Sequence, residues 1–353
     1  MSDVPKEVPE SELPLIGHTV RGDVWLARTA EEAIDPGLPI IDPHHHFSEH
    51  WGGYFGADLA ADAVAGHDIR ATVYIQCGHG YRSTGPQALR PVGETEQVVA
   101  IARAQAAERA KPRIAAGIVG YADLRLGEQV DAVLAAHVEA GDGRFRGIRN
   151  SGARHAAFRH GVLARPPAGL YLDDAFRRGF ARLSKYGLSF DVWVYHPQLA
   201  EVYDLARAFP HIPIVLNHIG GTLGVGPYAG RRREVFDEWR PMMKTLSACG
   251  NVAVKLGGLG TAVFGYDFAA QDRPPSSQQL ADAWRPYFET CIELFGAERC
   301  MFESNFPVDR AVCGYVVLWN AFKRVAAGAS DDERARLFHD NAARIYRLPP
   351  DDR

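Results

Sequence analysis

Short apolar or β-branched runs recur along the chain from Leu38 onward, and amphipathic segments separate them. Runs of this length bounded by turn residues predict buried strands. There are eight: Pro39–Pro43, Ala71–Gln76, Ile114–Val119, Phe145–Arg149, Leu188–Tyr195, Ile212–Asn217, Val252–Leu256 and Cys300–Glu303. Apolar residues at helical spacing lie between them. The clearest predicted helices are Glu94–Ala110, Glu128–Ala140, Pro197–Phe209 and Arg231–Cys249, and a further apolar stripe is formed by Leu280, Trp284, Tyr287, Phe288 and Cys291.

Strands that alternate with helices in this way predict an α/β fold with parallel strands. Eight such units favour a closed (β/α)8 TIM barrel. The main rival is an open doubly wound sheet, which would require a glycine-rich phosphate turn after its first strand. No GxGxxG follows Pro39–Pro43. We therefore expect one barrel domain over residues 38–348, an N-terminal arm or lid over residues 1–37, and an extra C-terminal helix over Asp331–Tyr346.

Composition narrows the choice of partner. The 353 residues are 46% hydrophobic and 23% charged, which is ordinary for a globular protein,. Lys and Arg number 39 against 43 Asp and Glu, so no basic footprint for nucleic acid or a membrane surface is present,. The five scattered cysteines argue against a disulfide framework and suit a reducing cytoplasm,. A small molecule is the expected partner.

The strongest chemical signal is the sequence Asp42-Pro43-His44-His45-His46 at the end of the first predicted strand. Side chains alternate across a strand, so His44 and His46 share a face and are expected to reach a metal over the barrel axis. His45 is expected to point away. The alternative interpretation is a histidine cluster that only caps a strand.

Two more histidines end predicted strands, His196 after the fifth and His218 after the sixth. Taken singly, each is as typical of a strand end as of a ligand. In a barrel, however, the carboxyl ends of the strands meet at one face. Together with His44 and His46 they predict a group of neutral imidazoles suited to zinc or another divalent transition metal.

At these strand ends the sequence resembles the amidohydrolase superfamily, and within it a branch of TIM-barrel hydrolases that includes sugar lactonases and pyrone-dicarboxylate lactonase. The resemblance covers about Ile40 to Tyr346. It is carried by Asp42-x-His44-x-His46, Phe145-Arg146-Gly147-Ile148-Arg149, His196-Pro197-Gln198-Leu199, Asn217-His218-Ile219-Gly220-Gly221, Val254-Lys255-Leu256-Gly257-Gly258-Leu259 and Glu303-Ser304-Asn305-Phe306-Pro307.

The resemblance implies that His44, His46 and His196 bind a divalent metal, most simply zinc, while His218 hydrogen-bonds the substrate or the attacking water. In the family the eighth strand normally ends in an Asp that binds metal and acts as general base. Asn305 stands at this position here. An amide does not accept a proton at neutral pH. Some lactonases of this branch are understood to work without metal, so Asn305 is also compatible with a metal-free site.

Two carboxylates are candidates to replace the missing Asp. Glu303 lies two residues before Asn305 and faces the same side of the strand,. It either supplies the general base or is a buried partner of Lys255. Asp309 is a weaker candidate on the following loop.

The substrate side of the predicted mouth is basic. Arg149 ends the fourth strand and is the preferred partner for a substrate carboxylate, followed by Arg82 or Arg154,. Gln76 is a candidate neutral donor, and Tyr228 is a candidate wall for a ring.

Three functions remain open at this stage. The first is a metal-assisted hydrolase that opens a lactone, or a related cyclic ester or amide, of a small carboxylate-bearing substrate. The second is a non-oxidative decarboxylase of an aromatic or enoic acid in the same superfamily. The third is a ligand-binding barrel that lost catalysis because Asn305 replaces the usual Asp. Related barrels commonly form homodimers, which makes a homodimer the expected assembly.

Overall fold

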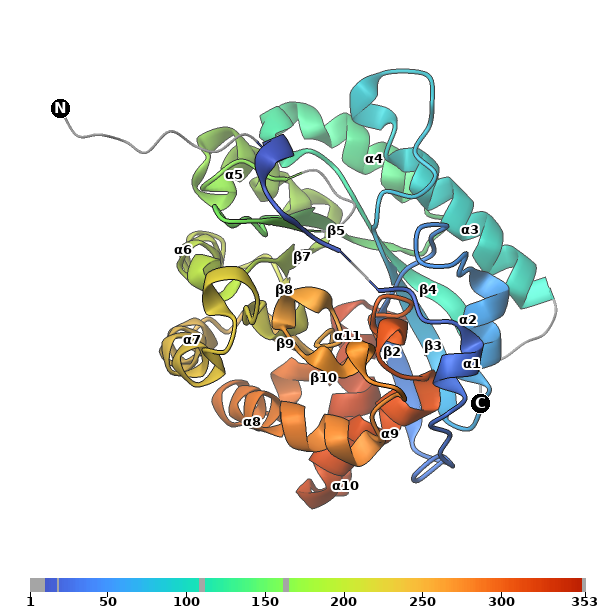
Figure 1. Cartoon of the computed structure of the whole chain (residues 1–353). Helices are drawn as coiled ribbons and strands as arrows, with labels where there is room; N and C mark the ends of the chain where they lie inside the picture. The colour runs from blue at the N-terminus through green and yellow to red at the C-terminus, as the bar shows by residue number, and fades with distance from the viewer. Residues whose placement is uncertain (1–9, 18, 108–111, 161–164, 351–353) are drawn as a thin grey trace.

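The computed structural model describes residues 10–17, 19–107, 112–160 and 165–350. Its centre is a sheet of eight parallel strands in the order β10-β9-β8-β7-β5-β4-β3-β2 (Figure 1). The strands are β2 (Pro39–His45), β3 (Asp68–Ile75), β4 (Arg113–Gly120), β5 (Phe145–Ser151), β7 (Ser189–Trp193), β8 (Ile214–Leu216), β9 (Val252–Leu256) and β10 (Cys300–Phe302). Each of the eight predicted strands is present, and the TIM-barrel prediction is confirmed.

The barrel closes between β2 and the segment that follows β10. The backbone N–H of Asn305 donates to the carbonyl of His44 at 2.8 Å. The N–H of His46 donates to the carbonyl of Phe306, also at 2.8 Å. The seam of the barrel is therefore made by the two segments that carry most of the predicted chemistry.

Eight helices surround the strands, one after each (Figure 1). They bury one face because their apolar residues recur at helical spacing. In α8, for example, Trp284 and Phe288 are buried, as the predicted stripe requires. The helices are α2 (Gly56–Ala63), α3 (Val92–Ala107), α4 (Val130–Ala140), α5 (Asp174–Ala181), α6 (Leu199–Ala208), α7 (Arg232–Ser247), α8 (Ser277–Phe295) and α9 (Tyr315–Val325).

The barrel interior changes character along its axis. Its lower layer is apolar, and Val215, Ala253 and Met301 pack there in one cluster. Two residues further along β9 and β10, the side chains that face the interior are those of Lys255 and Glu303, both fully buried. The period of two along a strand therefore stacks a charged layer directly on an apolar one.

The C-terminal segment closes the floor of the barrel. The predicted helix over Asp331–Tyr346 is interrupted, because a π-helical turn (Arg336–Asp340) separates α10 (Asp331–Ala335) from α11 (Asn341–Ile345). Beyond α11, Tyr346 and Leu348 pack in the same cluster as the apolar strand residues. Tyr346 and Leu348 thus belong to the barrel core.

The N-terminal arm crosses the opposite face. Its strand β1 (Leu15–Ile16) pairs in parallel with β6 (Arg159–His160), which lies in the loop after β5. A short helix, α1 (Asp23–Leu26), follows, and Trp25 is buried. Among the described residues, no helix is both long and apolar enough to span a membrane. All five cysteines are buried free thiols.

The position of Leu348 leads to a stability prediction. Leu348 is 8% exposed. Replacing it with Ala leaves a cavity at the barrel floor, so we expect Leu348→Ala to lower the free energy of unfolding by about 2 kcal/mol. Leu172→Ala is the matched control, because Leu172 is 52% exposed and the expected change is below about 0.5 kcal/mol,. Urea unfolding followed by fluorescence measures both, and equal losses would contradict a core role for the C-terminal segment.

Candidate active site

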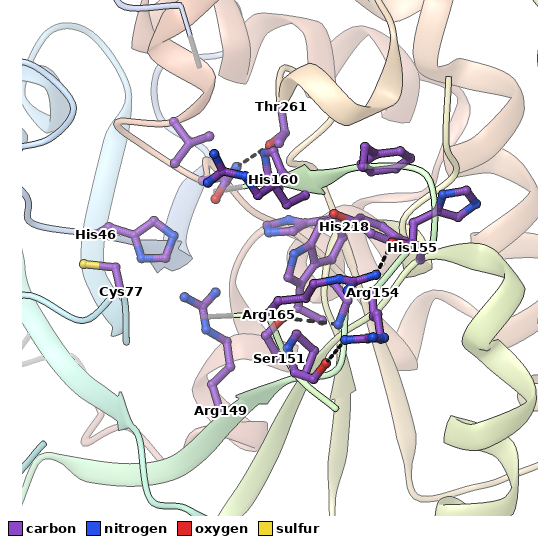
Figure 2. A pocket seen from close by; sticks show the side chains of 18 of the residues that line it. His46, Cys77, Arg149, Ser151, Arg154, His155, His160, Arg165, His218 and Thr261 are labelled. Carbon is purple, nitrogen blue, oxygen red and sulfur yellow. Dashed lines mark hydrogen bonds between the residues drawn. The ribbon is translucent and has the colours of Figure 1, made fainter. Parts of the chain in front are cut away.

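A cavity of about 420 Å³ opens at the carboxyl ends of the barrel strands. Its lining comes from several strand ends and the loops after them, and includes His46, Cys77, Arg149, Trp193, His218 and Asn305. Figure 2 shows His46, Arg149 and His218 around the same space. A cavity of this size accommodates a small molecule.

Below this cavity, the carboxylate of Glu303 contacts two histidines. Its Oε2 lies 2.6 Å from Nδ1 of His44, and its Oε1 lies 2.6 Å from Nδ1 of His218. The backbone N–H of His218 also donates to Oε1 at 3.1 Å. Because a carboxylate accepts hydrogen bonds, Nδ1 of His218 must carry the hydrogen, which leaves the lone pair of that imidazole on Nε2,. Nδ1 of His44 instead accepts a hydrogen bond from the ammonium of Lys255 at 3.3 Å, because an ammonium can only donate,.

Gly258 makes this close arrangement possible. It has φ +73°, and a Cβ at this position would lie 2.1 Å from Nδ1 of His218. Only glycine leaves room for the imidazole and adopts this backbone conformation without strain. The Gly257-Gly258 pair after β9 thus allows His218 to reach Glu303.

The third histidine, His46, has the same tautomer as His218 for a different reason. Its Nδ1 lies 2.7 Å from the carbonyl oxygen of Ile75, which can only accept a hydrogen bond,. Nε2 of His46 then faces Nε2 of His44 at 3.2 Å. Since Nδ1 of His44 accepts from Lys255, the hydrogen of that neutral ring is on Nε2 and points to the lone pair of His46,. A metal bound by both nitrogens would have to replace this hydrogen.

The histidines are also in the protonation state that a metal requires. Burial, with Lys255 next in importance, holds the pKa of His44 well below its usual value. Burial and then Arg149 lower the pKa of His46 in the same way. Both imidazoles are consequently neutral at pH 7, as imidazoles that bind a metal are.

Buried carboxylates lie around the histidines. Asp191 and Glu303 are fully buried, and Asp191 pairs with Lys255 at 2.8 Å. Two more buried carboxylates lie at the seam, and burial raises the pKa of Asp42 to about 6 and that of Asp309 to about 7. Among the described residues, His44, His218 and Glu303 have ligand atoms within 4.8 Å of one another. The donor set therefore fits a divalent metal.

Asn305 lies at the rim of this group with a buried carboxylate behind it. Its side-chain amide donates to Oδ1 of Asp309 at 2.8 Å and to Oγ1 of Thr261 at 3.2 Å. The backbone N–H of Gly260 donates to the other oxygen of Asp309 at 3.0 Å. The chain thus has an amide at the strand end and a carboxyl group four residues later.

The structure does not bring His196 into this cluster. The backbone N–H of Leu223 donates to its Nδ1 at 3.3 Å, so the hydrogen of the neutral ring is on Nε2,. That Nε2 faces Glu238 at 3.6 Å, and the ring packs edge-on against Tyr228. Among the described residues, His196, like His46, lies outside the group of His44, His218 and Glu303 that has metal-ligand spacing. The reason is local, because β7 ends at Trp193 and His196 begins a separate 3-10 turn.

The predicted substrate-binding residues divide into two sets. Arg149 and Arg154 line the cavity. Gln76 is buried beside Arg149, whose guanidinium donates to the Gln76 backbone carbonyl. Arg82 instead pairs with Glu96 on the exposed surface of α3. Tyr228 packs against His196, next to the cavity.

Sequence reasoning missed several cavity residues. Trp193 lines the cavity and packs edge-on against His218 with ring centroids 4.8 Å apart. Arg159 and His160 reach the cavity because β6 returns over the barrel mouth, and no local pattern predicts that path. Asp191, which is fully buried and does not line the cavity, was missed as well; it pairs with Lys255 at 2.8 Å. The only indication in the sequence was a charged residue within an otherwise apolar predicted strand.

Comparison with known proteins agrees with this geometry. A profile of the family described as amidohydrolase matches residues 41–348. The chain is 36% identical over 334 residues to the uncharacterized protein y4mH of Sinorhizobium fredii, covering 88% of this chain and 99% of that one. It is 29% identical over 328 residues to the L-fucono-1,5-lactonase of Burkholderia multivorans, covering 89% and 97%.

A solved structure of an amidohydrolase from Burkholderia multivorans, with bound zinc, superimposes with a TM-score of 0.68. It is 25% identical and covers 88% of this chain and 99% of that one. The barrel, the family profile and the lactonase relatives agree: the chain belongs to the amidohydrolase family and is a lactonase-like enzyme of that superfamily.

Proposed function

We propose that the protein is a zinc-dependent hydrolase that opens a small lactone bearing a carboxylate. The observation that carries the proposal is the group of histidines around Glu303 below a cavity lined by Arg149. Two relatives support the lactone, since L-fucono-1,5-lactonases of two Burkholderia species are 29% and 27% identical to this chain. The zinc in the similar amidohydrolase structure supports the choice of ion.

His44 and His46 would hold the ion through their Nε2 atoms. Two ligands of one tetrahedral zinc lie about 3.3 Å apart when each bond is about 2.0 Å. The 3.2 Å between the two Nε2 atoms matches this spacing. The 2.6 Å contacts of Glu303 are shorter than this spacing, and the one to Nδ1 of His218 is a hydrogen bond. Glu303 therefore acts behind the imidazoles, as carboxylates behind metal-binding histidines do.

When bound, a divalent ion polarises a carbonyl and lowers the pKa of water to about 7. The chain supplies the proton acceptor beside it. His218 donates its Nδ1–H to Glu303, so its Nε2 is the nitrogen that can take a proton from water,. Glu303 then stabilises the imidazolium, while the edge of Trp193 limits movement of the ring.

Arg149 is the residue proposed to bind the substrate carboxylate. Its side chain is 5% exposed and lines the cavity. Hydrogen bonds to the backbone carbonyl and side-chain oxygen of Gln76 hold the guanidinium in place. A guanidinium fixed in this way binds a planar carboxylate without first losing side-chain freedom.

Removal of the metal is the first test. We expect a chelator to lower hydrolysis of carboxylated lactones by at least about 100-fold, because polarisation of the carbonyl and activation of water are lost together. One equivalent of zinc, measured by elemental analysis, should restore the rate. Full activity of the stripped protein would exclude the metal mechanism. Decarboxylation of aromatic or enoic acids, with every lactone inert, would favour the decarboxylase, and binding without turnover would favour a non-catalytic barrel.

Replacement of Glu303 tests the orienting carboxylate. In Glu303→Gln, the negative charge beside His44 and His218 is lost and one carboxylate oxygen becomes an amide group, so we expect zinc affinity to fall about 10- to 100-fold,. The rate constant kcat should fall with it. Glu96→Gln is the control, since Glu96 pairs with Arg82 on the surface. Native zinc affinity in Glu303→Gln would show that the carboxylate does not orient the ligands.

A third experiment identifies the ligand set. His46→Asn removes a lone pair that faces His44, and we expect it to lower zinc affinity by at least about 10-fold. His196→Asn is expected to keep one equivalent of zinc, because Nδ1 of His196 already accepts the Leu223 amide. Zinc affinities from competition with a chelator distinguish the variants. Loss of zinc from His196→Asn would return His196 to the ligand set.

A further inference from the structure

The lining of the cavity carries positive charge beyond Arg149. Three further arginines reach it, Arg154, Arg159 and Arg165, all from the loop between β5 and α5. No Asp or Glu is among the described residues that line the cavity. A cleft lined by charge of one sign concentrates ligands of the opposite sign. The mouth of this barrel therefore favours a ligand with more negative charge than the one carboxylate that Arg149 is proposed to bind.

Two of these arginines lie close together on one side of the cavity. The guanidinium of Arg165 donates to the backbone carbonyl of His155 at 2.7 Å, and that of Arg154 donates to the carbonyl of Pro166 at 2.8 Å. Figure 2 shows Arg154, His155 and Arg165 together, on the side of the cavity away from His46. Burial, and then repulsion from the charge of Arg165, lowers the pKa of Arg154,. An anion bound between the two guanidiniums would relieve this repulsion.

The N-terminal arm positions the third arginine. Arg159 belongs to β6, which pairs in parallel with β1 of the arm. Its backbone N–H donates to the carbonyl of Pro14 at 3.0 Å, and its Nε donates to the carbonyl of Leu13 at 3.4 Å. The neighbouring Phe158 is buried, and its ring stacks on that of His155 with centroids 4.7 Å apart. These contacts hold the loop in place before a ligand arrives, which reduces the entropy lost on binding.

A phosphate monoester fits this group of arginines better than a second carboxylate does. A carboxylate has one charge and two oxygens, which a single planar guanidinium satisfies. A phosphate monoester carries about −1.5 to −2 charges at pH 7 and has three acceptor oxygens. Arginine suits such groups because its rigid fork of donors matches the phosphate oxygens. Three arginines on one loop therefore exceed what a carboxylate requires and match what a phosphate requires.

We propose that Arg154, Arg159 and Arg165 form a second anion-binding subsite, which binds a phosphate monoester at the end of the substrate remote from the lactone. Arg149 holds the carboxylate, and the N-terminal arm completes the subsite through Arg159. The substrate class thereby narrows to carboxylated lactones that also carry a phosphate on a remote substituent. The inference rests on the proposed hydrolase for the lactone, but phosphate binding tests the subsite without any turnover.

Binding of inorganic phosphate to the full-length chain is the first test. We expect isothermal titration to detect binding by the wild type, and Arg159→Gln/Arg165→Gln to weaken it at least about 10-fold, because charged hydrogen bonds are lost. Arg233→Gln is the matched control, since Arg233 is 87% exposed on α7 and pairs with Asp237. Equal phosphate affinities of the wild type and the double variant would overturn the inference. Acetate binding weakened as much as phosphate binding would show a carboxylate site and overturn the choice of phosphate.

The urea midpoint shows whether the double variant is folded. If its midpoint falls well below that of the wild type, Arg165→Gln alone replaces it, because this variant keeps the contacts of Arg159 with the arm. We expect Arg165→Gln to weaken phosphate binding about 3- to 10-fold. Unchanged phosphate affinity in a folded Arg165→Gln would remove Arg165 from the subsite and overturn the inference.

Turnover separates the subsite from the ester chemistry. For two carboxylated lactones that differ only in the remote phosphate, we expect wild-type kcat/KM to be at least about 100-fold higher with the phosphate. The double variant should lose most of this preference through a raised KM and hydrolyse the unphosphorylated lactone within about 2-fold of the wild-type rate. Hydrolysis with no preference for the phosphate would overturn the inference and leave the proposed hydrolase standing. Weakened phosphate binding in the double variant, with every lactone inert, would support the subsite and overturn the hydrolase.

Discussion

One carboxylate connects the chemistry of this barrel. Glu303 accepts from Nδ1 of His218 and lies 2.6 Å from Nδ1 of His44, and so joins the ends of β2, β8 and β10 across the interior. The hydrogen bond selects the tautomer of His218 and directs its lone pair away from the carboxylate. The roles proposed for His44 and His218 therefore both depend on this carboxylate.

Such a carboxylate can be buried only because the layers around it are complementary. Lys255 and Arg149 supply positive charge from β9 and β5, while backbone and side-chain donors reach each carboxylate of the charged layer. Below, an apolar layer and the C-terminal segment exclude water from the floor. The low-dielectric interior strengthens these contacts and makes an unpaired member costly. The same burial that keeps the histidines neutral therefore also makes the network depend on all of its members.

The sequence was sufficient to predict the elements that depend on a local pattern of apolar and polar residues. The eight strands and the juxtaposition of His44 and His46 follow from periods that the chain displays openly. The path of the chain after a strand does not follow from such a pattern. His196 comes three residues after the end of β7, and that short turn directs it toward Glu238, outside the histidine group. Arg159 entered the cavity because β6 pairs with the N-terminal arm, a contact between distant segments.

Asn305 stands where the family normally has an Asp, and its contact with Asp309 explains why an amide fits there. An Asp at position 305 would place a second carboxylate where the amide now donates to Asp309 at 2.8 Å. Two carboxylates at that distance cannot both be ionised, so one would have to keep a proton. The amide avoids this conflict and satisfies Asp309, whose pKa is already raised to about 7 by burial. The loss of an acid at the strand end and the burial of another four residues later are therefore one feature, and they are consistent with the proposal that the His218–Glu303 pair is the proton acceptor.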